Sequence, residues 1–402
     1  MDFAYSDRCE DYRGRLLEFM DREVYPAEPI NEEQALASGN PHAATPILEE
    51  LKAKAKSEGL WNLFMPEERW GPGLSNLDYA PLAEIMGRSI ELAPEATNCS
   101  APDTGNMEVL SNFGTPEQQE RWLIPLLEGD IRSCFSMTEP AVASSDPRNL
   151  ETSIVRDGDD YVINGRKWWI TGAAGPTCEI SILMGVTNPD ADPKGRFSMI
   201  LVPMNAEGLT VQRSLPTFGF QDRGGHCEIT YENVRVPAAN LIANEGDGYR
   251  IAQARLGPGR IHHCMRAIGM AERAFDLMVT RVKSRTAFGK KVSEQGVIQD
   301  WIAEARIRIE EARLLVLKTA WMIDTVGNRA ARTEISAIKV SVPRTALWVI
   351  DRAIQAHGAM GIGDDVPLSR MYALGRTLQI ADGPDEVHKM VLARRELGRY
   401  EV

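Results

Sequence analysis

Apolar residues recur at intervals of three and four positions through the first third of the chain, which is the spacing of one face of an α-helix. The pattern is clear over residues 12–23, 44–58, 77–89 and 115–127. In the last stretch, Thr115 followed by Pro116 is typical of a helix start, because Thr caps free backbone amides and Pro suits the first turn. We predict an N-terminal α-helical domain over residues 1–130.

From residue 131 the apolar runs become short, alternating or rich in β-branched residues, and Gly, Asp, Asn and Pro interrupt them. Asn164-Gly165 is typical of a hairpin turn and favours antiparallel strands. We predict a middle β domain, a compact sheet or barrel, over residues 131–243. Examples of its predicted strands are residues 161–163, 179–186, 197–202 and 228–231.

The helical spacing returns after residue 243 and continues to the end of the chain. Four long amphipathic stretches predict a four-helix bundle as the C-terminal domain, over residues 244–402. These stretches are residues 248–285, 295–326, 334–357 and 385–399. The fold class predicted for the chain is therefore multidomain α+β, in the order helical domain, β domain and helical bundle.

The chain has 402 residues, a formal net charge of −12 and a pI near 5.2. Proteins that bind nucleic acid need a basic surface, so we expect no nucleic-acid partner. No apolar stretch approaches the length of about 20 residues that spans a membrane, so we expect no membrane partner.

The six cysteines are scattered and form no Cys-x-x-Cys pair. Neither a disulfide framework nor a zinc site is expected from this spacing, and we predict no metal. Residues 1–7 are acidic and lack the apolar run of a signal peptide. We expect reduced, buried thiols in a cytoplasmic protein.

Asp382 is the first candidate for chemistry. It precedes Gly383-Pro384 and an amphipathic stretch with acidic residues at its start, which predicts a tight turn at the beginning of a helix. A carboxylate on such a turn can point into a cleft, where burial raises its pKa and suits it to act as a general base. The alternative is an Asp that only shapes the turn.

Three further motifs precede this turn: Thr138-Glu139-Pro140 with Ser144-Ser145-Asp146 after it, the stretch 162–171, and the run 285–290 of Arg-Thr-Ala-Phe-Gly-Lys. Together with the turn, in this order, they resemble the acyl-CoA dehydrogenase family over nearly the whole chain. The sequence of residues 381–388 is most similar to that of the branch found in multidomain members of the family. The extra kinase-like part of those members is not included in this sequence.

The resemblance implies an FAD-dependent enzyme of fatty acid β-oxidation that removes the α proton of an acyl-CoA thioester and passes the β hydride to flavin. Asp382 stands where most members place a Glu base, one methylene longer. Other members carry the base on a bundle helix, directly before an Arg similar to Arg260. The residue before Arg260 is Gly259, which has no side chain. Asp382 is therefore the predicted catalytic residue.

The resemblance also implies contacts with FAD in the β domain. Met137 and Thr138 match the segment that bonds the isoalloxazine edge, with Phe135 close by in the sequence. Trp169, Ile170 and Thr171 match the strand that packs on the ring. A Trp in an apolar strand is more often a core residue, and this alternative stays open for Trp169.

In the C-terminal part, Arg285 matches the residue that meets the FAD pyrophosphate, in many members from a neighbouring subunit. The loop 355–361 is similar to the Gly-rich loop that approaches FAD across a subunit contact. A solvated Arg and glycines that merely end a helix are the alternatives. The remaining cofactor-binding residues implied by the resemblance are Phe288, Gln295, Gln355, Gly358, Pro384 and Glu386.

For the substrate, the resemblance implies that Ser145, or with less support Ser144, contacts the CoA moiety, and that Arg260 and Gly383 lie on the substrate side. The sequence departs from the family where an Arg-Asp pair becomes Ala373-Leu374, a Tyr becomes Ala381 and a Thr becomes Pro384. Smaller groups at positions 381 and 259 favour an acyl group that is long or substituted beyond the β carbon, unless neighbouring side chains refill the space.

The family also implies an acyl-CoA substrate, an electron-transfer flavoprotein as electron acceptor, and assembly as a homodimer or homotetramer. Three alternatives belong to the same superfamily. A nitroalkane-oxidase-like enzyme also uses an Asp base and gives electrons to oxygen. An acyl-CoA oxidase would be expected to be longer, and a non-catalytic DNA-associated flavoprotein would need a basic C-terminal face.

Two other kinds of site are disfavoured. The pair His262-His263 could suggest a metal, but adjacent residues of a helix point apart, so a packed or solvent-facing pair is expected. No Gly-x-Gly-x-x-Gly follows a predicted strand, so we expect no nicotinamide site.

Overall fold

The computed structural model describes residues 4–400, and its contacts group the chain into two compact units. Unit 1 comprises Met1–Pro26, Ser57–Thr97 and Gly259–Val402, and unit 2 comprises Ala27–Lys56 and Asn98–Pro258. Each unit therefore combines distant parts of the sequence, and the three domain boundaries stay a prediction. The expectation of no signal peptide concerns in part residues 1–3, which lie outside the described residues.

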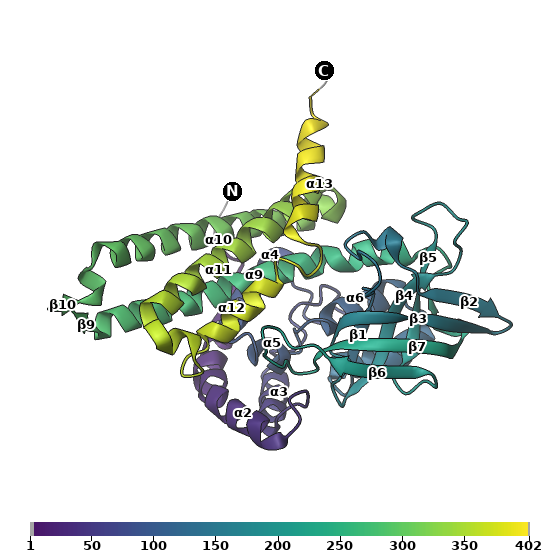
Figure 1. Cartoon of the computed structure of the whole chain (residues 1–402), viewed down its shortest axis with the longest axis horizontal. Helices are drawn as coiled ribbons and strands as arrows, with labels where there is room; N and C mark the ends of the chain where they lie inside the picture. The colour runs from purple at the N-terminus through teal and green to yellow at the C-terminus, as the bar shows by residue number, and fades with distance from the viewer. Residues whose placement is uncertain (1–3, 401–402) are drawn as a thin grey trace. The chain divides into compact units, whose positions relative to one another are not determined.

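Unit 2 is built on an eight-stranded mixed sheet (Figure 1). The strand order is β6-β7-β3-β2-β4-β5-β8, and β1 pairs in parallel with β4. The strands are β1 (Arg132–Ser136), β2 (Ser153–Asp157), β3 (Asp160–Thr171), β4 (Cys178–Val186), β5 (Phe197–Pro203), β6 (Leu209–Ser214), β7 (His226–Pro237) and β8 (Leu241–Ile242).

Five α-helices of unit 2 precede this sheet in the sequence, and one of them is hydrogen-bonded to β1. They are α2 (Tyr25–Ser38), α3 (Pro46–Ser57), α6 (Asp103–Phe113), α7 (Pro116–Gln118) and α8 (Ile124–Glu128). Asp103 of α6 accepts a hydrogen bond of 2.7 Å from the backbone N–H of Ser133 in β1. The predicted helix start at Thr115 is confirmed, because its side chain and that of Gln118 form a reciprocal capping box.

The hairpin predicted at Asn164-Gly165 is wrong. Both residues lie inside β3, at a shift in its register with β7, and the turn between β2 and β3 is at Gly158, with φ of 63°. The glycine at 165 serves close packing instead, since a Cβ there would lie 2.3 Å from Oγ1 of Thr152. The short-range turn signal was therefore overruled by a tertiary contact.

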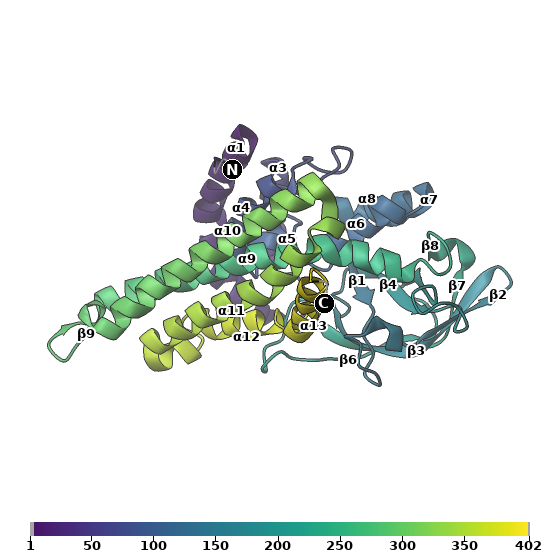
Figure 2. The same cartoon turned by 90° about the horizontal axis from the view of Figure 1, so that it is seen from above.

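Unit 1 is helical apart from a two-stranded hairpin, β9 (Thr286–Ala287) and β10 (Lys290–Lys291). Figures 1 and 2 show α10 and α11 as long neighbouring helices, with α12 and α13 against α11. The helices are α1 (Asp7–Phe19), α4 (Asn76–Gly87), α5 (Ala93–Ala96), α10 (Gly296–Ala330), α11 (Arg332–His357), α12 (Leu368–Thr377) and α13 (Asp385–Leu397), with α9 (Gly248–Ser284) entering from unit 2.

The crossing of α4 and α9 depends on two glycines. A Cβ at Gly87 would lie 2.1 Å from the carbonyl oxygen of Arg266, and a Cβ at Gly269 would lie 1.9 Å from that of Glu84. Neither position has room for a side chain, so the two helix backbones touch directly at this point.

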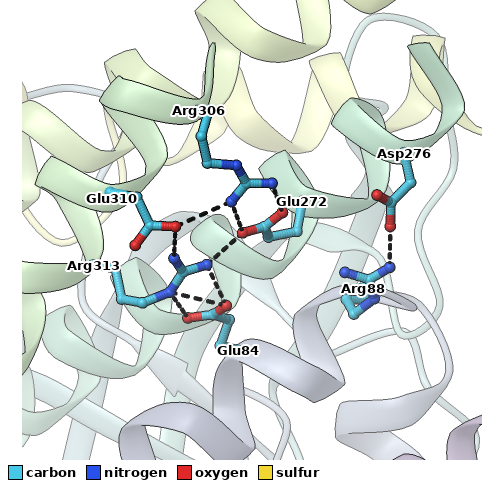
Figure 3. Close-up of polar contacts among 7 residues, drawn as sticks. All are labelled: Glu84, Arg88, Glu272, Asp276, Arg306, Glu310 and Arg313. Carbon is cyan, nitrogen blue, oxygen red and sulfur yellow. Dashed lines mark hydrogen bonds and ion pairs between the residues drawn. The ribbon is translucent and has the colours of Figure 1, made fainter. Parts of the chain in front are cut away.

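Beside this crossing, a network of charged side chains links α4, α9 and α10 (Figure 3). Arg313 contacts Glu84 at 2.8 Å and Glu310 at 2.6 Å, and it also reaches Glu272. Arg306 contacts Glu272 at 2.8 Å. Burial alone would raise the pKa of Glu272, but hydrogen bonds from both arginines lower it below its usual value. The two arginines therefore hold the Glu272 carboxylate in the charged form.

The predicted fold class is confirmed: helices, then a sheet, then a helical bundle. The four long predicted helices correspond to α9, α10, α11 and α13, while α12 was not predicted. All six cysteines are buried and unpaired, as expected. Within residues 4–400, no helix is both long enough and apolar enough to cross a membrane.

Candidate active site

Asp382 lies on the turn between α12 and α13 of unit 1. Its φ is 56° and that of Gly383 is 100°, so two consecutive residues have left-handed backbone conformations. This conformation is unfavourable for Asp by about 1–2 kcal/mol and persists only where the surroundings hold it. Pro384 is the N-cap of α13.

Side chains from α9 and α13 hold Asp382 in place. Nε of Arg260 donates to the Asp382 carbonyl oxygen at 3.0 Å. Nε2 of His388 lies 3.2 Å from the same oxygen. The Nε2 atom of His263 lies 3.3 Å from the Oδ2 atom of Asp382. The Asp382 side chain is 19% exposed, so its carboxylate is shielded and still accessible.

The groups around this carboxylate are mostly basic. Lys339 of α11 is 1% exposed and donates to the carbonyl oxygen of Leu378; burial lowers its pKa. Burial, with Arg260 and Lys339, lowers the pKa of His388 to about 4, so this imidazole is neutral at pH 7. A partly buried carboxylate beside fixed donors can accept a proton from a carbon acid that is brought next to it.

In unit 2, the segment of Met137 and Thr138 is fastened to β3. The Trp168 amide donates to the carbonyl oxygen of Thr138 at 3.0 Å, and the Thr138 hydroxyl donates to that of Trp168 at 2.5 Å. Lys167, with no exposed surface, donates to the Met137 carbonyl oxygen and to the Glu139 carboxylate, both at 2.8 Å. The strand and the preceding segment therefore form one rigid edge.

The three predicted residues at the end of β3 have different surroundings. Trp169 is 44% exposed with φ of 55°, so it is not the core aromatic that the alternative described. The Ile170 side chain is 1% exposed and packs in the sheet core. The Thr171 hydroxyl lies 2.9 Å from Nδ1 of His226, whose Nε2 lies 2.7 Å from a carboxylate oxygen of Asp222.

Some of the other predicted residues of unit 2 contact neighbouring side chains or backbone groups. The guanidinium of Arg255 lies 3.9 Å from the centre of the half-buried Phe135 ring. The Ser144 hydroxyl accepts from the Glu139 amide at 2.8 Å, whereas Ser145 is exposed. The geometry thus favours Ser145 over Ser144 for a contact with an external group.

The predicted residues of unit 1 outside the Asp382 turn lie at the surface. Phe288 is 101% exposed with φ of 54°, at the tip of the β9–β10 hairpin. Arg285, Gln355, Gly358 and Glu386 are exposed, and Gln295 is half-buried. The structure does not bring these residues to the Asp382 carboxylate.

The structure thus groups Asp382, Gly383 and Arg260 in unit 1, and Met137, Thr138 and β3 in unit 2. Sequence reasoning missed His263 and His388 as partners of Asp382. A signal for His263 was present, because it lies three residues after Arg260 on one helix and so shares a face with it.

The helical, sheet and bundle segments follow one another in the order found in a class of flavin-dependent oxidoreductases. The chain matches the acyl-CoA dehydrogenase N-terminal domain over residues 6–130, the middle domain over 134–234 and the C-terminal domain over 246–397. It therefore belongs to the acyl-CoA dehydrogenase family.

Individual relatives agree with this assignment. The Mycobacterium tuberculosis protein named "Probable acyl-CoA dehydrogenase FadE2" is 60% identical over 99% of this chain and 98% of its own length. Human "Acyl-CoA dehydrogenase family member 11" is 50% identical over 98% of this chain, which spans 51% of that protein. The solved butyryl-CoA dehydrogenase of Megasphaera elsdenii is 26% identical with a TM-score of 0.83, covering 99% of this chain and 100% of its own.

Proposed function

We propose that this chain binds FAD and introduces an α,β double bond into an acyl-CoA thioester, with Asp382 as the base that removes the α proton. The main support is the Asp382 carboxylate itself, which is 19% exposed on a left-handed turn and contacted by His263, in a chain of this family. Bound FAD supplies the acceptor for the β hydride. Arg260 and Gly383 are the proposed substrate-side residues, and Ser145 the proposed CoA contact.

The residues of the sheet unit fit a flavin. Trp169 exposes a flat aromatic surface, Thr171 two residues further along β3 is half-buried, and the Thr138 segment is immobilised by Lys167. In the proposal, Phe135, Met137, Thr138, Trp169, Ile170 and Thr171 hold FAD. The exposed residues Arg285, Phe288, Gln355 and Gly358, with the half-buried Gln295, complete the FAD site of a second copy of the chain, in a homodimer or homotetramer. Pro384 and Glu386 are further proposed FAD contacts.

The electrons then pass to an electron-transfer flavoprotein, and the reaction belongs to the cytoplasmic β-oxidation of fatty acids. The alternative is an enzyme that gives its electrons to oxygen, as a nitroalkane-oxidase-like or acyl-CoA-oxidase-like protein would. Peroxide formation measured with and without an artificial electron acceptor separates the two, since a dehydrogenase should form little peroxide in either case.

Asp382→Asn tests the base. The amide keeps the size of the side chain and cannot accept the α proton, so the rate of flavin reduction by acyl-CoA should fall by several orders of magnitude while the FAD content stays unchanged. Asp365→Asn, at an exposed position in the loop before α12, is the matched control and should keep the wild-type rate. Near-normal reduction in Asp382→Asn would show that another group removes the proton.

The space near the base also supports a preference for bulky acyl groups. Ala381 has a small side chain, and a Cβ added at Gly259 would lie 3.9 Å from Oδ2 of Asp382. Each additional buried methylene contributes about 0.8 kcal/mol, or roughly fourfold in kcat/KM. Long-chain or 4-substituted acyl-CoA should therefore exceed butyryl-CoA in kcat/KM, and the reverse order would contradict the preference.

A further inference from the structure

His263 of α9 contacts the carboxylate of Asp382 with its side chain. Its Nε2 atom lies 3.3 Å from Oδ2, and the two side chains are 23% and 19% exposed. Nε of Arg260 and Nε2 of His388 contact the Asp382 carbonyl oxygen. These two contacts fix the backbone of the turn, whereas the contact from His263 acts on the carboxylate.

The protonation of His263 follows from its second neighbour. Nη2 of Arg266 lies 3.4 Å from Nδ1 of His263, and Arg266 is 4% exposed. A guanidinium can only donate, so Nδ1 must be the acceptor, and the ring proton is on Nε2. The imidazole therefore donates its Nε2–H to Asp382 and has no position for a second proton while Arg266 faces Nδ1.

The charges around His263 support a neutral ring. Arg260 and Arg266 approach from α9, Lys339 from α11 and His388 from α13, with Asp382 as the facing carboxylate and Asp385 near Lys339. Burial lowers the pKa of His263; Asp382 opposes this, while Arg266 and Lys339 add to it. The neighbouring Cys264 thiol is also neutral at pH 7, because burial raises its pKa to about 12.

We propose that His263 is a positioning residue for the proposed base: it holds Asp382 in one rotamer and in the ionised state by a hydrogen bond from Nε2–H, and it does not receive the abstracted proton. This inference rests on the proposed function of Asp382. A donor to the charged form of a carboxyl group favours that form, so His263 keeps Asp382 ready to accept a proton at neutral pH.

The preceding residue offers a matched control. His262 is 2% exposed and faces the opposite way, with its ring centre 4.8 Å from that of Tyr79 and 6.4 Å from that of Phe64. It contacts no carboxylate within the part of the chain that the structure describes. His262→Phe keeps an aromatic ring in an aromatic environment and should leave the pH dependence of catalysis unchanged.

The test compares kcat/KM for acyl-CoA against pH in FAD-loaded wild type, His263→Leu, His263→Gln and His262→Phe. His263→Leu removes the donor, so the acidic limb of the profile should move up by about one pH unit, a tenfold change in the equilibrium constant. Its kcat at pH 7 should fall by about 10- to 100-fold with KM little changed. His263→Gln retains an N–H at a similar reach. It should return the acidic limb to its wild-type position and kcat at pH 7 to within about threefold of the wild-type value.

A second measurement does not depend on turnover. ¹⁵N NMR of the histidine rings, with the His263 signals identified by their loss in His263→Gln, should show the neutral Nε2–H form from pH 6 to 8. An imidazolium signal in that range, or a His263→Leu variant with the wild-type pH profile, would overturn the proposal. Failure of the proposed function gives a different result, an active Asp382→Asn variant, so the two outcomes are distinguishable.

Discussion

Lys167 is a charged side chain without exposed surface, and its three acceptors lie in different segments of unit 2. Besides the Met137 carbonyl and the Glu139 carboxylate, it donates to the Met184 carbonyl oxygen at 2.7 Å. Glu139 in turn accepts from the amides of Glu151 and Thr152. Every charge of the pair is therefore satisfied, and removal of one partner leaves the other buried and uncompensated.

Lys167→Met should lower the free energy of unfolding by about 3–5 kcal/mol, the usual cost of leaving one half of a buried ion pair. It should also weaken FAD binding, because the Met137 segment loses its anchor. Urea unfolding and FAD titration of the apoprotein measure the two effects. The double variant Lys167→Met/Glu139→Gln should recover part of the stability; a double variant as unstable as the single one would contradict the paired-charge explanation.

The same lysine predicts a dependence of stability on pH. Burial lowers the pKa of Lys167 to about 8, below the value of about 10.4 in the unfolded chain. The unfolded state therefore binds the proton more tightly, and the resulting cost to stability is present below pH 8 and disappears as the pH rises toward 10.4. The unfolding free energy of Lys167→Met should lack this rise between pH 8 and 10; an identical rise in both proteins would assign it to other groups.

At the level of single residues, the sequence predicted that Asp382 lies on a tight turn, because the Gly-Pro sequence after it indicates a turn at a helix start. It did not predict the left-handed φ of Asp382 itself, nor the contact with His263, which lies 119 positions earlier in the chain. Both depend on how α9 packs against the α12–α13 turn, and a local pattern does not contain that information.

Among the helices of unit 1, Arg313 is the side chain that joins the largest number of elements in the network of Figure 3. It contacts carboxylates from α4, α9 and α10 and is 18% exposed. Arg313→Met should destabilise unit 1 by about 3–5 kcal/mol, since three carboxylates lose their shared cation. Arg399→Ala, which breaks an exposed pair with Glu396, is the control and should give no measurable change.

The network also predicts how the wild type responds to acid. Glu272 and Glu310 have pKa values below the ordinary value of about 4.3, because the hydrogen bonds of Arg306 and Arg313 outweigh burial. Their contribution to stability is full above the unfolded pKa and is lost as the pH falls through the lower folded values. Urea midpoints measured from pH 6 to 3 should fall less steeply in Arg313→Met than in wild type; parallel curves would refute this origin.

At the level of elements, hydrophobic periodicity predicted α9, α10, α11 and α13, because long helices present a continuous apolar face. The ten-residue α12 was missed, since it spans fewer than three turns. The hairpin at Asn164-Gly165 was wrong because two-residue turn signals compete with packing, and here the packing of Thr152 against Gly165 decides.

For the molecule as a whole, Phe288 tests the proposed assembly. Its ring is 101% exposed, so Phe288→Ser should leave the stability of the single chain unchanged. If the ring is buried against a second copy, its loss removes about 1.5–3 kcal/mol, which is about 10- to 100-fold in FAD retention or in dimer dissociation. Light scattering and FAD release measure both, with Leu36→Ser, at an 80% exposed position, as the control. Wild-type assembly and FAD retention in Phe288→Ser would count against the proposal.

Gly259 and Asp382 are 123 positions apart in the chain, yet a Cβ at one lies 3.9 Å from the carboxylate of the other. If Asp382 is the base, a carboxylate at the same position in space could come from either of two segments that are far apart in the sequence. An acidic residue could therefore move from the turn to the helix by two substitutions, without any change of fold. A relative that has lost the aspartate should not be judged inactive until the residue on the helix has been inspected.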